Sequence, residues 1–94
     1  MKRKKTERWV LRLYVSDGST KSVAAFRNLK AICTECLLSP YDLEVVDLLE
    51  HPERAMADNI VAIPTLMKMA PGPQTRMVGD LSNRSRALAW LGLT

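Results

Sequence analysis

The feature that most constrains the fold is a strand-like segment, residues 9–15, that is apolar on both faces. Alternate residues of an extended chain point to opposite sides. The segment WVLRLYV therefore places four apolar residues on one face, and Val10 and Tyr14 on the other. Such a strand is typical of a sheet interior that is covered on both sides. We therefore expect this strand to lie in the middle of a sheet.

An amphipathic pattern predicts a helix over residues 20–37. Ser19 follows a Ser-Asp-Gly turn, and its hydroxyl can accept a hydrogen bond from a free amide of the first helical turn. Ser39 precedes a proline, which disfavours the helical conformation and ends the segment. Apolar side chains recur at steps of three and four residues, which predicts one buried face. The residues expected on that face are Val23, Phe26, Leu29, Cys33 and Cys36, with Ile32 and Leu37 beside them.

The rest of the chain predicts short alternating elements. The helix crosses between two strands, so the strand after it should pair parallel to the first. A Pro-Gly-Pro turn predicts a hairpin, and Ser82 is the expected N-cap of a final helix that buries Leu88 and Leu91. The expected elements are a strand at 43–49, a helix from Pro52 to about Asn59, a strand from 65 to 69, a strand at 75–78 and the final helix.

The summed order is βαβ, a short helix, then ββα, which is the α/β order of thioredoxin-like domains. Pro64 opens a strand in this order and is a candidate for a cis peptide bond. The alternative is a trans proline at the start of an edge strand. The segments after residue 50 are short and show little contrast between helix and strand propensity, so tertiary contacts can decide their structure.

The net charge of +4 belongs to the first residues of the chain. Residues 1–8 contain five basic residues and one acidic residue, whereas residues 9–94 contain nine of each. We therefore expect a flexible basic arm at 1–8 and a single domain at 9–94. Such an arm can strengthen contacts to nucleic acid, which makes a nucleic-acid adaptor one alternative function. No signal-peptide pattern and no apolar run of about 20 residues is present, so we expect a cytoplasmic protein.

The motif Cys33-Thr34-Glu35-Cys36 matches the C-x-x-C pattern of thiol oxidoreductases. A reactive thiolate of that kind lies at a helix N-terminus, whereas these cysteines lie more than three turns beyond Ser19. Core cysteines are therefore the favoured interpretation, with a thioredoxin-like oxidoreductase and metal capture as alternatives. His51 is the single histidine, too few for a zinc site or a catalytic triad. We expect no catalytic residue, no metal and no cofactor.

Five segments in order resemble the KaiB family, the small partner proteins of KaiC-type ATPases in bacterial timing systems. The segments are LRLYVSDGSTKSVAAFRNL, VVDLLEHPERA, IVAIPTLMK, Pro71-Gly72-Pro73 and MVGDLSNR, and they span roughly residues 10–86. The resemblance implies a regulator that is not an enzyme. It would bind a KaiC ATPase ring and alter the ring's phosphorylation and ATPase cycle. It also implies two folds for one sequence: a βαββααβ ground state that assembles as a tetramer and differs from about residue 50 onward, and a thioredoxin-like monomer that binds the ring.

The resemblance also indicates site residues. The expected partner-binding residues are Asp58, Asn59, Ile60 and Arg76. Those expected to shape the switching region are Pro64, Pro71, Pro73, Gly79, Asp80, Trp90 and Gly92. The sequence departs from the family where Asn59 replaces a usual lysine and where Thr75 replaces a usual arginine. These departures indicate a divergent member. The resemblance itself implies a role in a circadian clock or in a simpler timing or stress system, and self-association as a dimer or tetramer.

Overall fold

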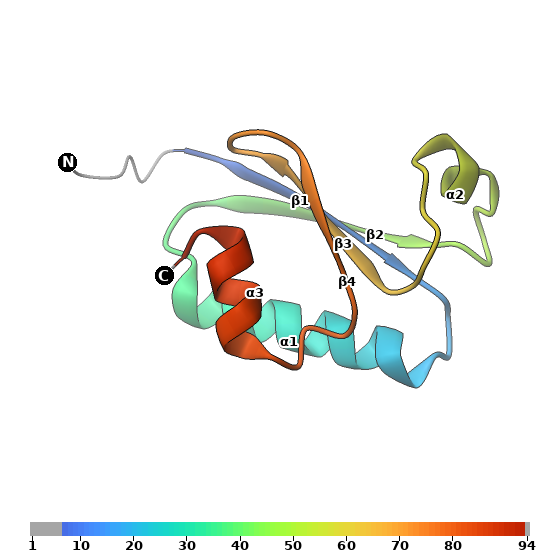
Figure 1. The fold of residues 1–94 in the computed structure, drawn as a ribbon, viewed down its shortest axis with the longest axis horizontal. Helices are drawn as coiled ribbons and strands as arrows, with labels where there is room; N and C mark the ends of the chain where they lie inside the picture. Colours follow the sequence, from blue (N-terminus) through green and yellow to red (C-terminus); the bar gives the residue numbers. More distant parts are fainter. Residues whose placement is uncertain (1–6, 94) are drawn as a thin grey trace.

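The computed structural model describes residues 7–93 and has a four-stranded sheet with helices on both faces (Figure 1). Helices α1 and α3 cover one face, and the short helix α2 lies over the other face at one end of the sheet. The elements are β1 (Trp9–Val15), α1 (Thr20–Cys36), β2 (Tyr41–Asp47), α2 (Glu53–Ala57), β3 (Thr65–Ala70), β4 (Thr75–Val78) and α3 (Arg84–Leu91). This order confirms the thioredoxin-like fold that the sequence predicts.

The sheet has the strand order β2-β1-β3-β4. Strand β1 pairs parallel with β2 and antiparallel with β3, and β3 pairs antiparallel with β4. The predicted central position of residues 9–15 and the predicted parallel pair are both confirmed. Strands β2 and β4 therefore form the two edges of the sheet, and β1 and β3 lie in its interior.

The core consists of two clusters, one on each face of the sheet. The larger cluster lies between the sheet and helices α1 and α3, and it contains the alternate residues of β1 that begin with Trp9. The smaller cluster lies under α2 and consists of Tyr14, Val46, Ile60 and Met67. Through Ile60, this second cluster packs the segment that follows α2 against the sheet.

The predicted buried face of α1 is wrong in its first half. Ser22 and Ala25 face the sheet, together with the correctly predicted Leu29, whereas Val23 and Phe26 are 52% and 43% exposed. The small residues let the helix approach the sheet closely, and the Ser22 hydroxyl accepts a hydrogen bond from the Ser16 amide at 3.0 Å. Val23 and Phe26 lie beside Val45 of β2, and because β2 is the edge of the sheet, no further strand within residues 7–93 covers their outer side.

Three predicted element boundaries are also corrected. Strand β2 begins two residues earlier than expected, at Tyr41, and ends at Asp47, whose Oδ1 accepts a hydrogen bond from the Leu49 amide in the turn that follows. Helix α2 ends at Ala57 with Asp58 as its C-cap, close to the predicted end at about Asp58 or Asn59, and Asn59 has a left-handed φ of 56°. Asn83 caps α3 in place of the predicted Ser82, because its side chain accepts a hydrogen bond from the Arg86 amide at 3.1 Å.

Two peptide bonds that precede prolines are cis. The Ile63–Pro64 bond confirms the prediction for Pro64, and the edge-strand alternative is excluded because β3 is an interior strand. The cis bond before Pro71 is not predicted from the sequence. Gly92 ends α3 in the left-handed conformation with φ 76°, a position that favours glycine because it has no Cβ. Leu91 is buried as predicted, whereas Leu88 is partly buried.

Candidate partner-binding site

The four predicted partner-binding residues come together at the end of α2, beside strand β4. The guanidinium of Arg76 donates hydrogen bonds to the main-chain carbonyls of Asn59 at 2.7 Å and of Asp58 at 3.1 Å. Asn59 and Arg76 are exposed, whereas Ile60 is only 9% exposed and packs in the smaller core cluster. In this fold Ile60 therefore anchors the segment, and its neighbours form the surface.

Asp58 is the centre of a charged network that joins α2 to the sheet. Its Oδ2 accepts a hydrogen bond from the Tyr14 hydroxyl at 2.6 Å and forms ion pairs with Arg54 at 3.5 Å and Arg12 at 3.7 Å. Glu44 on β2 completes the network through Arg12 at 2.7 Å and Arg54 at 3.4 Å. Because Tyr14 is fully buried, its hydroxyl needs this acceptor inside the protein.

The network shifts the pKa values of its titratable members. The hydrogen bond from Tyr14, with the charges of Arg54 and Arg12, lowers the pKa of Asp58. Partial burial alone would raise the pKa of Glu44, but the hydrogen bonds from Arg12 and Arg54 outweigh it and lower that pKa. Burial, followed by the hydrogen bond to Asp58, raises the pKa of Tyr14. Both carboxylates are therefore charged at neutral pH, and the tyrosine is protonated.

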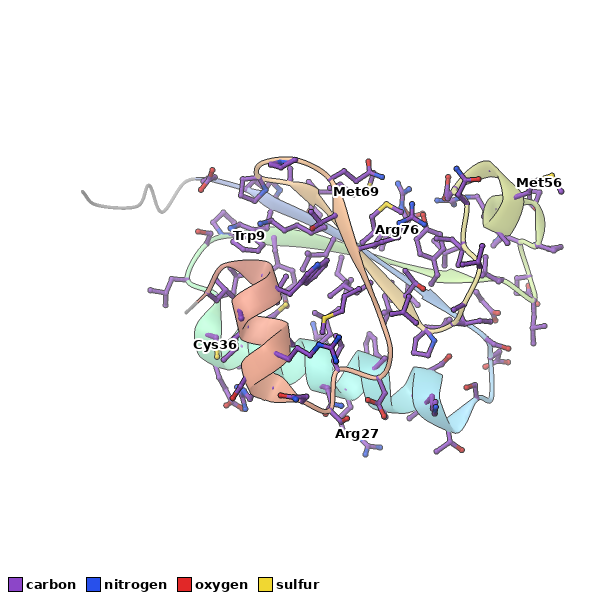
Figure 2. The ribbon with its side chains drawn as sticks, in the orientation of Figure 1. Trp9, Arg27, Cys36, Met56, Met69 and Arg76 are labelled. Carbon is purple, nitrogen blue, oxygen red and sulfur yellow. The ribbon has the colours of Figure 1, made fainter. Side chains whose placement is uncertain are left out.

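A polar cleft of about 210 Å³ opens beside this network. Figure 2 shows Arg76 and Met69 on this side of the sheet, with Met56 extending from α2 farther along. The cleft is lined by Arg12, Ala57, Asp58, Asn59, Met67, Met69, Gln74 and Arg76. Apolar side chains also face solvent nearby, since Met56 is 85% and Val61 96% exposed. Exposed apolar residues beside positioned charged groups are typical of protein-binding surfaces.

Four members of the site are not predicted from the sequence: Arg12, Tyr14, Glu44 and Arg54. The strand period places Arg12 and Tyr14 on the same face of β1, which is a signal that these side chains share surroundings. Their pairing with Asp58 depends on how α2 packs on the sheet, and no local pattern encodes that.

The residues predicted to shape the switching region lie apart from this cluster. Gly79 has a φ of 125°, and Asp80 supports the turn before α3 by accepting a hydrogen bond from the Ser82 amide at 3.0 Å. Pro73 lies in the exposed turn between β3 and β4, and Trp90 on α3 packs partly against the larger core cluster. Asp80 is therefore a turn residue in this fold, while the switching roles stay predictions.

The structure gives little support to the two alternatives of a thioredoxin-like oxidoreductase and of metal capture by the cysteines. Cys33 is buried and Cys36 partly buried, both at the end of α1 opposite the Ser16–Ser19 turn, and burial raises the pKa of the Cys33 thiol. Among residues 7–93, no group of three or more His, Cys, Asp or Glu side chains could hold a metal ion. Within the same range no helix is long and apolar enough to cross a bilayer.

The basic arm is described only at its end, because residues 1–6 lie outside the described residues. Arg8 forms two hydrogen bonds to Asp42, each 2.6 Å long, at the start of β2. The predicted flexibility of the arm and its role in nucleic-acid binding therefore stay predictions.

The acid stability of the fold is expected to depend on Asp58 and Glu44. Each carboxyl has a folded-state pKa below its unfolded value of about 4, so the stabilisation is complete above that value and is lost as the pH falls through the folded-state pKa. We expect the free energy of unfolding to fall below about pH 5, measured by urea titration at several pH values. The variant D58N should show a shallower fall. An equal fall in both proteins would contradict the contribution of Asp58.

Fold and site together define a class of protein: a thioredoxin-like domain with a charged network and a polar cleft at the end of α2, and with its cysteines away from the start of its first helix. A family model described as KaiB domain matches residues 12–93, and the chain belongs to the KaiB family. It is 42% identical over 86 residues to the circadian clock protein KaiB3 of Synechocystis sp., covering 92% of this chain and 84% of that protein. It is 43% identical over 93 residues to the circadian clock oscillator protein KaiB of Nostoc punctiforme, covering 99% and 88%.

Solved structures agree on the fold. The N-terminal domain of Synechococcus elongatus SasA matches with a TM-score of 0.72 at 22% identity, covering 100% of this chain and 92% of that one. Mitochondrial thioredoxin 3 of Saccharomyces cerevisiae matches with a TM-score of 0.69 at 13% identity, covering 95% and 79%. At these identities the likeness shows the fold alone, and it agrees with the predicted resemblance to thioredoxin-like domains.

Proposed function

We propose that this chain is a non-enzymatic regulator that binds a KaiC-type ATPase ring in the cytoplasm and modulates the ring's phosphorylation and ATPase cycle. The observation that carries the proposal is the double hydrogen bond from Arg76 to the carbonyls of Asp58 and Asn59. It brings residues from two distant segments, which family resemblance marks as partner-binding, onto one surface. Membership of the KaiB family, whose relatives are named as circadian clock proteins, supports the same function.

The surface suits a protein partner. Arg76 hydrogen-bonds main-chain oxygens, which do not neutralise its charge, so a partner carboxylate can pair with it. Met56 and Val61 add apolar area that a partner would cover. An arginine at the centre of such a contact often contributes a large share of the binding energy.

The experiment measures ATP-dependent co-migration of the chain with a KaiC-type ATPase ring. We expect the wild-type chain to bind and R76A to bind about tenfold more weakly, a loss of about 1.4 kcal/mol. R27A is the matched control, because Arg27 is an exposed arginine on α1, away from the candidate site (Figure 2). Thermal unfolding of both variants tests whether they stay folded. Equal binding by R76A and R27A would contradict the proposed surface.

We also propose that the chain exchanges between the fold described above and a βαββααβ state that assembles as a tetramer or dimer. Light scattering coupled to size-exclusion chromatography, with and without the ring, tests this directly. A larger free species that is replaced by a ring-bound monomer supports exchange. A free chain that is monomeric at every concentration would contradict it.

A further inference from the structure

The two thiols of the C-x-x-C motif lie at the end of α1 and have different surroundings. Cys33 is 4% exposed and belongs to the larger core cluster, whereas Cys36, the last residue of the helix, is partly exposed. Both are free. Figure 2 shows Cys36 at the end of α1 beside α3. The proposed partner surface uses neither residue.

A cation lies against the more accessible thiol. Arg84, the first residue of α3, donates from Nη2 to the sulfur of Cys36 at 3.4 Å and to Oε1 of Glu35 at 2.7 Å. A neighbouring cation stabilises a thiolate, which is the nucleophilic form of cysteine. The guanidinium is charged at all physiological pH values, so Arg84 provides this charge without needing a proton switch.

The buried thiol is suited to a different role. Burial raises the pKa of Cys33, although Lys30 and Tyr41 partly oppose the effect. The Lys30 ammonium donates to the Tyr41 hydroxyl at 3.2 Å at the same end of the helix. A buried, protonated thiol reacts slowly with solutes, but it can attack an oxidised sulfur one helical turn away as it passes its proton to the hydroxide that leaves that sulfur.

The end of the helix can bring the two sulfurs together. Residues three apart on a helix have Cβ atoms about 5–6 Å apart, whereas a disulfide needs about 3.5–4.5 Å. Cys36 is the last helical residue, and Leu37 already has an extended backbone with φ −97° and ψ 116°. The final turn therefore needs to open at only one or two residues for the bond to form.

We propose that Cys36 is a site of oxidation by hydroperoxides and that Cys33 is its resolving thiol. In the first step the Cys36 sulfur gives up its proton and attacks a peroxide oxygen, the O–O bond breaks, and the released hydroxide takes up that proton to form water. In the second step the Cys33 sulfur attacks the sulfenic acid of Cys36, and the S–S bond forms as the S–O bond breaks. The leaving hydroxide takes the proton of Cys33. The two thiols lose two electrons together, and one hydrogen peroxide becomes two waters.

Disulfide formation would change the contact between α1 and α3. Opening the last turn of α1 moves Glu35 and Cys36 away from Arg84, which removes both of its side-chain contacts to that helix. The hydrogen bond from Asn28 to the Asp80 carbonyl, earlier along α1, is retained. Oxidation is therefore expected to loosen the start of α3 while the sheet stays intact.

The test treats the full chain with hydrogen peroxide and follows it by intact mass and peptide mapping. We expect a loss of two hydrogens per chain, a Cys33–Cys36 bond within one chain, and reversal by dithiothreitol. C33A should stop at the sulfenic acid of Cys36, which dimedone traps. C36S should leave Cys33 unoxidised over the same time.

Two variants separate the role of Arg84 from a general charge effect. R84Q should slow oxidation of Cys36 about threefold or more, because it removes the cation beside the sulfur. R86Q should leave the rate unchanged, because Arg86 is an exposed arginine two residues farther along α3. Oxidation of Cys33 in C36S as fast as oxidation of Cys36 in C33A, disulfides that join two chains, or an unchanged rate in R84Q would overturn the proposal. No arm of the test uses the ATPase ring, so its outcome is independent of the proposed function.

Discussion

Replacing Leu13 with alanine is expected to lower the free energy of unfolding by about 3 kcal/mol. Leu13 is fully buried at the centre of β1, between Val45 of β2 and Leu66 of β3. It packs in the cluster between the sheet and helices α1 and α3. The substitution removes apolar contacts and leaves a cavity that interior strands cannot easily close, and both effects destabilise the fold.

Urea denaturation measures this loss, with an unchanged dependence on denaturant showing that the unfolded state is unaffected. V61A is the control, since Val61 is 96% exposed and its truncation should change stability by less than about 0.5 kcal/mol. A domain of this size has a thin margin of stability, so L13A should also be partly unfolded near body temperature. Similar stabilities for L13A and V61A would contradict the assignment of Leu13 to the core.

The sequence predicts the sheet well because its strongest signals are local. The apolar residues on both faces of residues 9–15 predict an interior strand, and the structure places that strand between two neighbours. Ser19 caps α1 as predicted, with its side chain accepting from the Ser22 amide. Both signals depend on alternation or on a single turn, which the chain encodes within a few residues.

The buried face of α1 is predicted less well because the most apolar residues of its first half are not the ones that are buried. Val23 and Phe26 are more apolar than Ser22 and Ala25, yet the small residues face the sheet. The choice depends on how closely the helix approaches the sheet and on which strand forms the edge. Both are properties of the assembled fold, and they cannot be predicted from the spacing of apolar residues along one helix.

The candidate site is predicted only in part for the same reason. Family resemblance identifies Asp58 and Arg76, but the buried hydroxyl of Tyr14 gives no local sign that its acceptor lies 44 residues later in the chain. Arg12 and Glu44 lie opposite each other on paired strands, a relation fixed by the register of β1 and β2. Once that register is known, their ion pair is an expected cross-strand contact.

Truncating Asp58 to alanine is expected to reduce both stability and partner binding. The Tyr14 hydroxyl would lose its acceptor while it stays fully buried, which costs about 1–3 kcal/mol. Arg12 and Arg54 would keep their ion pairs with Glu44 but lose the carboxylate that they share at the end of α2. Because the carbonyls of Asp58 and Asn59 hold Arg76, a loosened segment should also weaken ring binding by about tenfold.

D58N separates positioning from direct charge contact. Its amide oxygen can still accept the hydrogen bond from Tyr14, so we expect less than about half of the stability loss of D58A. The Asp58 side chain is only 22% exposed and already engages Tyr14, Arg12 and Arg54, so its charge is largely used inside the protein. We therefore expect D58N to bind the ring within about threefold of the wild-type chain, compared by ATP-dependent co-migration at equal concentrations. If D58N binds as weakly as D58A while staying folded, the carboxylate contacts the partner directly, and the positioning role is wrong.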